Sequence, residues 1–171
     1  HDFDGYPLGR GFINRNSRLI VRMMTRDKDT EVDETFIRRR VKDAWEYRKK
    51  VVDTGSCRVI FGEADGFPGL TVDRFSDLLV TQTLSAGMER IKHLIFPLLV
   101  EVLRRDGQDI RGIFERNDVA IRELEGLPQN KGWFDFGEAF PDTVTEICEN
   151  GVYYRVDVEN GQRSEEHTSE L

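Results

Sequence analysis

Residues 62–82 read GEADGFPGLTVDRFSDLLVTQ, and this stretch decides the fold class of the chain. Its first third is rich in glycine and contains a proline, which predicts a turn before the chain becomes extended. The apolar and β-branched residues of 70–75 and 78–84 then predict two strands, because such side chains suit a pleated, half-buried surface. Ser76-Asp77 favours a tight turn between them. We therefore expect an antiparallel hairpin in the middle of the chain.

The segments on either side of this hairpin predict an α+β fold in which most strands are antiparallel. Two segments place apolar residues at three- and four-residue steps, which is typical of amphipathic helices. Thr30–Asp33 is a polar start for the first helix, Pro97 is expected to kink the second, and Asn150-Gly151 predicts a hairpin turn. The expected elements are a helix ending near Val51, strands at 58–61 and 110–114, a helix at 88–102, a short helix at 119–124, a loop at 127–142, and strands at 144–148 and 152–158.

The amino-terminal segment, residues 8–25, predicts two short strands joined by a turn at Asn14–Ser17. Gly9 and Gly11 would allow a β-bulge or a tight bend there. Two strands cannot bury a core by themselves. We therefore expect this segment to be the end of a small β-domain whose beginning precedes His1.

The composition is that of a globular protein with a highly charged surface. Of the 171 residues, 38% are hydrophobic and 33% are charged, and the net charge is −7. Basic residues nevertheless outnumber acidic ones in the first third of the chain, which predicts a basic face, although a solvated helix face would give the same pattern. No apolar run is long enough to span a membrane. Cys57 and Cys148 lie far apart and suit a reducing compartment, so the cytoplasm is the expected location.

The sequence contains no recognisable motif for catalysis or metal binding. His93 is the one histidine away from the chain ends, and neither an HExxH motif nor a glycine-rich phosphate loop occurs. Carboxylates gather near the turns around the central hairpin, but their spacing fits no metal-binding loop, and turn formation accounts for them. We expect no metal site. Without further information, the residues predict a scaffold.

Four stretches together resemble one family of proteins. The stretch 62–82 is similar to a signature of bacterial class I SAM-dependent ribosomal RNA methyltransferases, in particular those that methylate C5 of a cytosine in 23S rRNA. Two more stretches follow in the family's order, ERNDVAIRELEGL at 115–127 and ENGVYYRVDVENGQ at 149–162. Residues 8–24, LGRGFINRNSRLIVRMM, resemble the closing strands of the family's PUA domain, a small RNA-binding β-barrel. The resemblance covers residues 5–162.

The resemblance implies an enzyme of three parts, of which this chain would hold the end of the first part and the second part. The implied segments are the carboxy-terminal part of a PUA domain at 1–26, a connector helix at 27–57, an α+β central domain at 58–142 and a β-hairpin at 143–162. That hairpin would lead into a Rossmann-like domain, missing here, that binds S-adenosylmethionine (SAM). Residues 163–171, RSEEHTSEL, depart from the family's pattern and look like a translated sequencing-library adapter, so we expect an artefact there.

The resemblance also places the methyl-transfer chemistry outside this chain, because the family's catalytic cysteine and SAM-binding residues lie in the missing domain. We therefore expect no catalytic and no cofactor-binding residue here, and no activity of the chain alone. The RNA-binding candidates are basic or polar residues of the PUA remnant and the connector: Arg10, Arg15, Asn16, Arg18, Arg22, Arg38, Arg39 and Lys42. The residues that match family motifs without an assigned role are Glu63, Asp65, Pro68, Asp73, Arg74, Arg116, Asp118 and Arg122.

The expected function is that of a fragment of a SAM-dependent rRNA methyltransferase that binds and positions ribosomal RNA. Two alternatives remain open: a stand-alone RNA-binding or interaction module without catalysis, and an unrelated α+β enzyme with an unrecognised site. The target nucleotide and the oligomeric state are left open, with a homodimer as one option. No membrane partner is expected.

Overall fold

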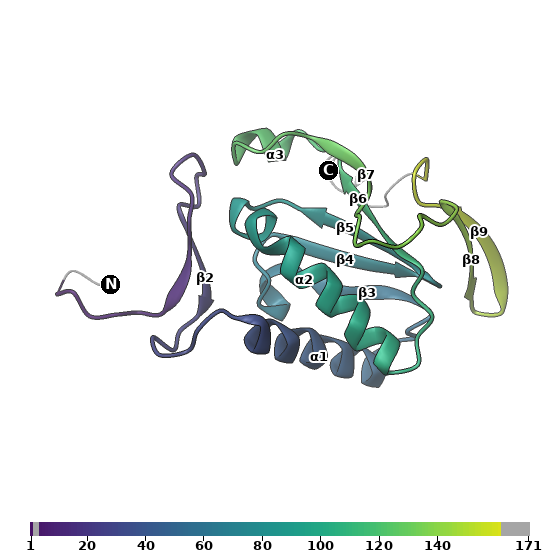
Figure 1. Cartoon of the computed structure of the whole chain (residues 1–171), viewed down its shortest axis with the longest axis horizontal. Coiled ribbons are helices and arrows are strands. Elements are labelled where there is room, and N and C mark those ends of the chain that lie inside the picture. The colour runs from purple at the N-terminus through teal and green to yellow at the C-terminus, as the bar shows by residue number, and fades with distance from the viewer. Residues whose placement is uncertain (2–3, 162–171) are drawn as a thin grey trace.

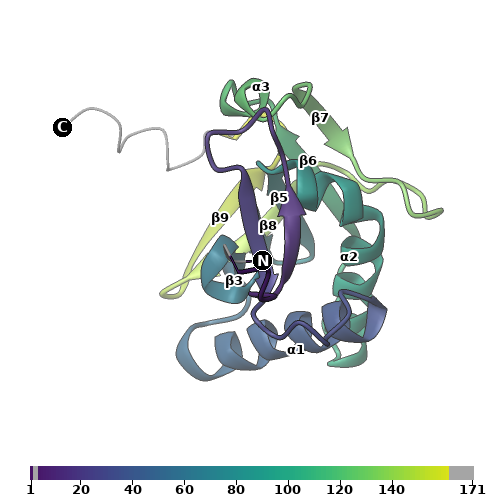
Figure 2. The same cartoon turned by 90° about the vertical axis from the view of Figure 1, so that its left-hand side faces the viewer.

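The computed structural model describes residues 1 and 4–161, and Figures 1 and 2 show it from two directions. The expected artefact at 163–171 lies outside these described residues. In chain order the elements are β1 (Arg10–Ile13), β2 (Val21–Thr25), α1 (Glu34–Val51), β3 (Ser56–Phe61), the 3₁₀ turn η1 (Gly62–Asp65), β4 (Leu70–Phe75), β5 (Leu78–Thr83), α2 (Ala86–Arg105), β6 (Gly112–Asn117), α3 (Ile121–Leu124), β7 (Asn130–Trp133), β8 (Val144–Glu149) and β9 (Val152–Asp157).

The central sheet has five strands in the order β3-β4-β5-β6-β7. Neighbouring strands are antiparallel except β5 and β6, which run parallel and are joined by α2. Strands β4 and β5 pair from Leu70↔Thr83 to Phe75↔Leu78, so the turn lies at Ser76–Asp77 as predicted. The α+β class is confirmed, with a mixed sheet at its centre.

Helices α1 and α2 pack on one face of this sheet (Figure 1). Asp33 caps α1 by accepting a hydrogen bond from the backbone N of Phe36 at 2.8 Å, which satisfies a donor that the first turn leaves free. The apolar stripe of α1 then faces the sheet, and Ile37 and Trp45 are buried in the main core. Helix α2 continues through Pro97 as one helix. Within the described residues, no helix is long and apolar enough to cross a membrane.

The opposite face of the sheet is partly covered by the hairpin β8–β9 and the residues after it. Val158 joins Val80 and Phe114 of the sheet in a second, smaller apolar cluster. Thr145 donates a hydrogen bond to Asp77 at 2.6 Å, which ties β8 to the β4–β5 turn. Asn150-Gly151 has φ values of 52° and 80°, as the turn of a two-residue hairpin requires. The predicted hairpin is confirmed.

The amino-terminal hairpin pairs β1 with β2 as a separate two-stranded sheet. Its register shifts between Arg10 and Gly11, which agrees with the predicted bulge. Glycine is required at Gly9, where an added Cβ would lie 2.1 Å from the carbonyl oxygen of Thr25. Side chains larger than hydrogen would therefore push the two strands apart.

Two contacts join this hairpin to the helices. The ring of Phe12 packs on Gly87 at the start of α2, where an added Cβ would lie 2.5 Å from the ring. On β2, Met24 is buried in the main core, and its carbonyl oxygen accepts a hydrogen bond from Arg40 of α1. The hairpin therefore rests on both helices of the central layer.

The structure differs from the sequence prediction at the far edge of the sheet. Residues 130–133 form β7, although the whole of 127–142 was predicted to be a loop, and this prediction was wrong. The sequence NKGW lacks a run of β-branched residues, and the strand exists because it pairs with β6 from Phe114↔Trp133 to Asn117↔Asn130. Strand β6 also starts and ends later than predicted, and α3 is only four residues long.

Candidate functional site

The loop between β1 and β2 lies beside α3 (Figure 2), and its basic side chains are exposed. We call residues 14–18 the arginine loop, because it carries Arg15 and Arg18. Both side chains are exposed, and neither has an ion-pair partner among the residues that the structure describes. Asn16, the third candidate on this loop, is also exposed. The predicted RNA-binding residues of this loop therefore lie on an exposed surface that is physically able to bind an anion.

Behind the arginine loop lies a buried carboxylate that the sequence did not reveal. Glu125, just after α3, accepts hydrogen bonds from Asn14 Nδ2 at 3.0 Å and from Ser17 Oγ, and its carboxylate lies 3.0 Å from Arg22. Burial alone would raise the pKa of Glu125, but the hydrogen bonds from Ser17, Asn14 and Arg22 outweigh burial and lower it. Glu125 is therefore held ionised by three residues that are more than a hundred positions away.

The other two candidates on the hairpin already have partners. Arg22 lies 3.0 Å from Glu125 and 3.3 Å from Glu63, so two carboxylates share its charge. Arg10 donates to the carbonyl oxygen of Lys28 at 2.8 Å and lies 3.8 Å from Glu31. Arg22 therefore joins the hairpin to the central domain, and it is a weaker RNA-binding candidate than Arg15 or Arg18.

The three candidates on α1 also differ in whether a carboxylate is bonded to them. Arg38 is bonded to Glu34 at 2.8 Å and lies 2.9 Å from Glu101 of α2, and these bonds raise its pKa, the one to Glu34 most. Arg39 and Lys42 are exposed, and no carboxylate partner for either is found in the described part of the chain. They form a second cationic position, on a different element from the arginine loop (Figure 1).

The family-motif residues of the central stretch make contacts that stabilise the fold. Asp65 pairs with Arg48 of α1 at 2.5 Å and accepts from the backbone N of Phe61 at 2.6 Å. The carbonyl oxygen of Pro68 accepts a hydrogen bond from Ser85, the residue that caps α2, at 2.7 Å. Glu63 pairs with Arg22, as described above. These contacts fasten η1 and its turn to both helices.

Two more motif residues bind along the strands and their turns. Asp73 on β4 pairs with Arg58 on β3 at 2.8 Å. Arg74, buried on the other face of β4, donates to Gln108 at 2.7 Å and to the carbonyl oxygen of Ser76 at 2.6 Å. Both residues have their charge or donors engaged within the domain.

In the motif stretch 115–127, one residue binds the last described residues of the chain. Arg116 lies 3.1 Å from Asp118 and also donates to the carbonyl oxygens of Val158 and Gly161, at 3.2 and 3.0 Å. A residue of β6 thus holds the segment that follows β9. The motif is explained by this long-range contact, which the sequence alone does not indicate.

Arg122 belongs to a buried charged cluster that sequence reasoning missed. Its side chain donates to Glu89 of α2 at 3.0 Å and to the carbonyl oxygens of Thr83 and Pro128. Lys92, one turn further along α2, lies 2.8 Å from Glu89 and 2.7 Å from Glu115 of β6. The only sequence signal is the Glu89–Lys92 spacing, because the other partners come from distant segments.

Burial and pairing oppose each other in this cluster. Burial alone would lower the pKa of Lys92, but the hydrogen bonds to Glu115 and Glu89 outweigh burial and raise it. Each cation has a carboxylate within hydrogen-bond distance. The cluster is thus an internally neutral network, which fits a structural role better than acid–base catalysis.

The carboxyl ends of the parallel strands β5 and β6 are where a nucleotide-like cofactor would be expected to bind in an α/β sheet. Here those ends are filled by protein. Asn117 accepts a hydrogen bond from the backbone N of Thr83 at 2.8 Å, Arg122 covers the same strand end, and Phe12 packs on Gly87 where α2 begins. These residues do not fit SAM. Within the described residues, no group of three or more His, Cys, Asp or Glu could hold a metal ion.

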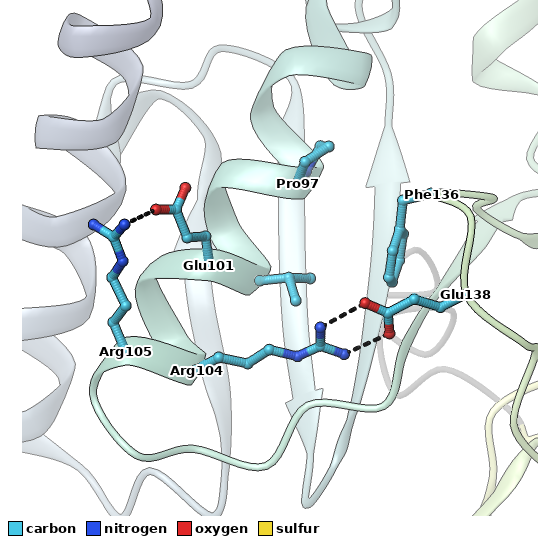
Figure 3. Close-up of a pocket in the computed structure, with 7 residues that line it drawn as sticks. Pro97, Glu101, Arg104, Arg105, Phe136 and Glu138 are labelled. Carbon is cyan, nitrogen blue, oxygen red and sulfur yellow. Dashed lines mark hydrogen bonds and ion pairs between the residues drawn. The ribbon is translucent and has the colours of Figure 1, made fainter.

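A pocket of about 480 Å³ lies between α2 and the segment that follows β7 (Figure 3). Pro97 and Phe136 give it apolar walls. At its rim, Arg104 binds Glu138 through two bonds of 2.7 and 2.8 Å. Arg105 and Glu101, which also line the pocket, form a second ion pair at 2.6 Å (Figure 3). The charged groups of the pocket are thus paired with one another, which does not favour a catalytic role.

The two cysteines, far apart in sequence, line one pocket together with Arg48 and Arg58. Cys57 is half-buried, and burial raises its pKa, so its thiol is a poor nucleophile at neutral pH. Cys148 is exposed on β8. The sequence correctly indicated two free thiols, while their closeness in space was not predicted.

Comparison with solved structures defines the class of fold first. The chain superimposes with a TM-score of 0.68 on a Streptococcus mutans protein assigned as a SAM-dependent methyltransferase, at 18% identity, over 90% of this chain and 38% of that one. A second solved methyltransferase structure, complexed with SAH, gives a TM-score of 0.69 at 18% identity, over 91% and 37% of the two chains. The chain therefore has the fold of one portion of these larger proteins.

Sequence comparison then identifies the relatives. The chain is homologous over most of its length to proteins named ribosomal RNA large subunit methyltransferase I: it is 38% identical over 164 residues to the one from Aliivibrio fischeri and 40% identical over 165 residues to the one from Aeromonas salmonicida. Each alignment covers 94% of this chain and 40% of the relative, so the chain spans about two fifths of these proteins. No protein-family model matches the chain. The resemblance to this methyltransferase family is confirmed.

Proposed function

We propose that this chain is the RNA-positioning portion of a SAM-dependent methyltransferase whose full-length form modifies C5 of a cytosine in 23S rRNA. The homology to ribosomal RNA large subunit methyltransferases over 94% of the chain supports this proposal. Residues 1–26 are proposed to belong to a PUA domain, and SAM is proposed to bind a carboxy-terminal domain. The cytoplasm is the proposed location, because ribosomal RNA is the proposed substrate.

The observation that carries RNA binding is the pair of exposed arginines on the arginine loop, for which the described residues offer no ion-pair partner. A guanidinium group presents a planar fork of donors that suits phosphate oxygens, and it remains charged at any physiological pH. Phosphate contacts of this kind fix the position of a nucleic acid without reading its sequence. Arg39 and Lys42 on α1 would add cationic contacts at a second position.

Methyl transfer by this chain alone is not part of the proposal. Methylation at C5 of cytosine needs a thiolate that attacks C6, and a base that removes the proton from C5. Burial raises the pKa of Cys57, which opposes this role. The strand ends of β5 and β6 are closed by Phe12, Asn117 and Arg122, which leaves SAM without a fitting site among the described residues.

Binding of labelled 23S rRNA fragments at a series of salt concentrations tests the proposal. We expect affinity to fall steeply with salt, and the Arg15→Ala/Arg18→Ala variant to bind more weakly, with a log–log salt slope reduced by about 1.4 if two phosphate contacts are lost. The matched control is Arg90→Ala/Arg155→Ala, which removes two exposed arginines from α2 and β9. An unchanged slope in the loop variant would contradict RNA binding by the arginine loop.

The same samples, incubated with radiolabelled SAM, are expected to transfer no methyl group to the RNA. Methyl transfer would contradict the proposal that this chain positions RNA and that a carboxy-terminal domain binds SAM. A genomic reading frame that stops after Leu171 would instead favour the stand-alone RNA-binding module.

A further inference from the structure

The arginine loop owes its conformation to two of its own polar side chains. The backbone N of Asn14 donates to the carbonyl oxygen of Ile20 at 2.9 Å, which closes the loop. Asn14 Oδ1 accepts from the backbone N of Asn16, and Ser17 Oγ accepts from the backbone N of Leu19, both at 3.1 Å. Asn14 and Ser17 therefore define the loop that carries the two exposed arginines.

The same two side chains also contact the central domain, and both do so at one residue. Asn14 Nδ2 donates to the carbonyl oxygen of Glu125 at 2.9 Å and to its carboxylate at 3.0 Å, while Ser17 Oγ donates to the other carboxylate oxygen. Arg22 lies 3.0 Å from that second oxygen and neutralises the charge. Glu125 thus organises the loop from outside, through both of the side chains that shape it.

We propose that Glu125 is a positioning residue for RNA: it holds the arginine loop so that Arg15 and Arg18 are presented together to the phosphates of RNA. This inference rests on the proposed function. The carboxylate itself does not touch RNA, because its oxygens are occupied by the hairpin and its side chain is buried. Glu125 orders the loop before RNA binds, so that binding does not incur the entropic cost of ordering it.

The test compares Glu125→Gln with Glu123→Gln. Both substitutions remove one negative charge from the same short segment, but Glu123 is exposed and accepts a hydrogen bond from Gln129 instead of the loop. Affinity is measured for a fluorescein-labelled single-stranded oligonucleotide of 23S rRNA sequence, with the full chain. We expect Glu125→Gln to weaken binding about fivefold and Glu123→Gln to leave it unchanged or slightly tighter.

A double-mutant cycle separates positioning from a general effect on folding. In the Arg15→Ala/Arg18→Ala background, Glu125→Gln should have no further effect on affinity, because the groups it positions are gone. Ser17→Ala provides a second variant, since it removes one bond to Glu125 and changes no charge. It should weaken binding less than Glu125→Gln and lose its effect in the same background. Thermal unfolding checks that each variant is folded.

The outcomes distinguish the two proposals. If the Arg15→Ala/Arg18→Ala variant binds as tightly as the wild type, the proposed RNA-binding function fails. If that variant is weakened but Glu125→Gln equals Glu123→Gln, the positioning role fails while RNA binding stands. A loss from Glu125→Gln that persists undiminished in the loop variant would also overturn the positioning role.

Discussion

The central sheet and the amino-terminal hairpin are both built from short strands, but different forces hold them in place. Every residue of β5 is buried, whereas Met24 is the one buried residue of β1 and β2. The sheet is stabilised by apolar burial against two helices. The hairpin is attached through Phe12, Met24 and the polar contacts to Glu125. The chain can therefore carry a polar, exposed loop without exposing its core.

The largest expected effect lies in the charged cluster at the end of the sheet. Arg122→Ala should lower the free energy of unfolding by about 4 kcal/mol, because it removes a buried guanidinium that bonds Glu89 and leaves the carbonyl oxygens of Thr83 and Pro128 without this donor. The exposed Arg90→Ala on α2, next to Glu89, should change the free energy of unfolding by less than about 0.5 kcal/mol. Urea denaturation measures both, and equal effects would mean that the cluster is solvated.

A smaller effect compares apolar side chains in the two regions. Leu79→Ala in β5 should cost about 3 kcal/mol, since its side chain is fully buried in the main core. Ile13→Ala in β1 should cost less than about 0.5 kcal/mol, because Ile13 is 72% exposed. The same denaturation experiment applies. Similar losses in both variants would contradict the exposed position of Ile13 on the hairpin.

The smallest effect is the pH dependence of the hairpin's attachment. Because the pKa of Glu125 is lowered in the folded chain, its contribution is present above the ordinary value of 4.5 and is lost as the pH falls through the folded-state value. Glu125→Gln should cost about 1 kcal/mol at pH 7. That difference from the wild type should shrink below pH 4.5. A difference that stays constant down to pH 3 would contradict the ionised carboxylate, and unfolding at each pH measures it.

Features set by local sequence could be predicted. The apolar spacing of α1 and its cap at Asp33 are local, and so is the Asn150-Gly151 turn, which needs only its own backbone conformation. The central stretch was predictable for the same reason, since apolar and β-branched residues on both sides of a polar turn specify a hairpin. The family resemblance rested on the central stretch and on three other short stretches of local sequence, and the comparisons confirmed it.

Features set by partners distant in sequence could not be predicted. Strand β7 has a weak strand sequence and exists because β6 offers it an edge to pair with. Arg22 was predicted as an RNA-binding candidate from its charge, and the sequence does not show that the carboxylates of Glu63 and Glu125 lie beside it. The roles of Glu125 and Arg122 depend on the same kind of long-range contact.

The contacts of the hairpin have a mechanical consequence. Phe12 rests on α2, Met24 is bonded to α1, and Asn14 and Ser17 are bonded to the residue after α3. A body joined at one point can swivel, whereas one joined to three separate elements cannot turn without breaking a joint. A force on the arginine loop would therefore move the helices and the sheet together with the loop, instead of bending the hairpin away from them.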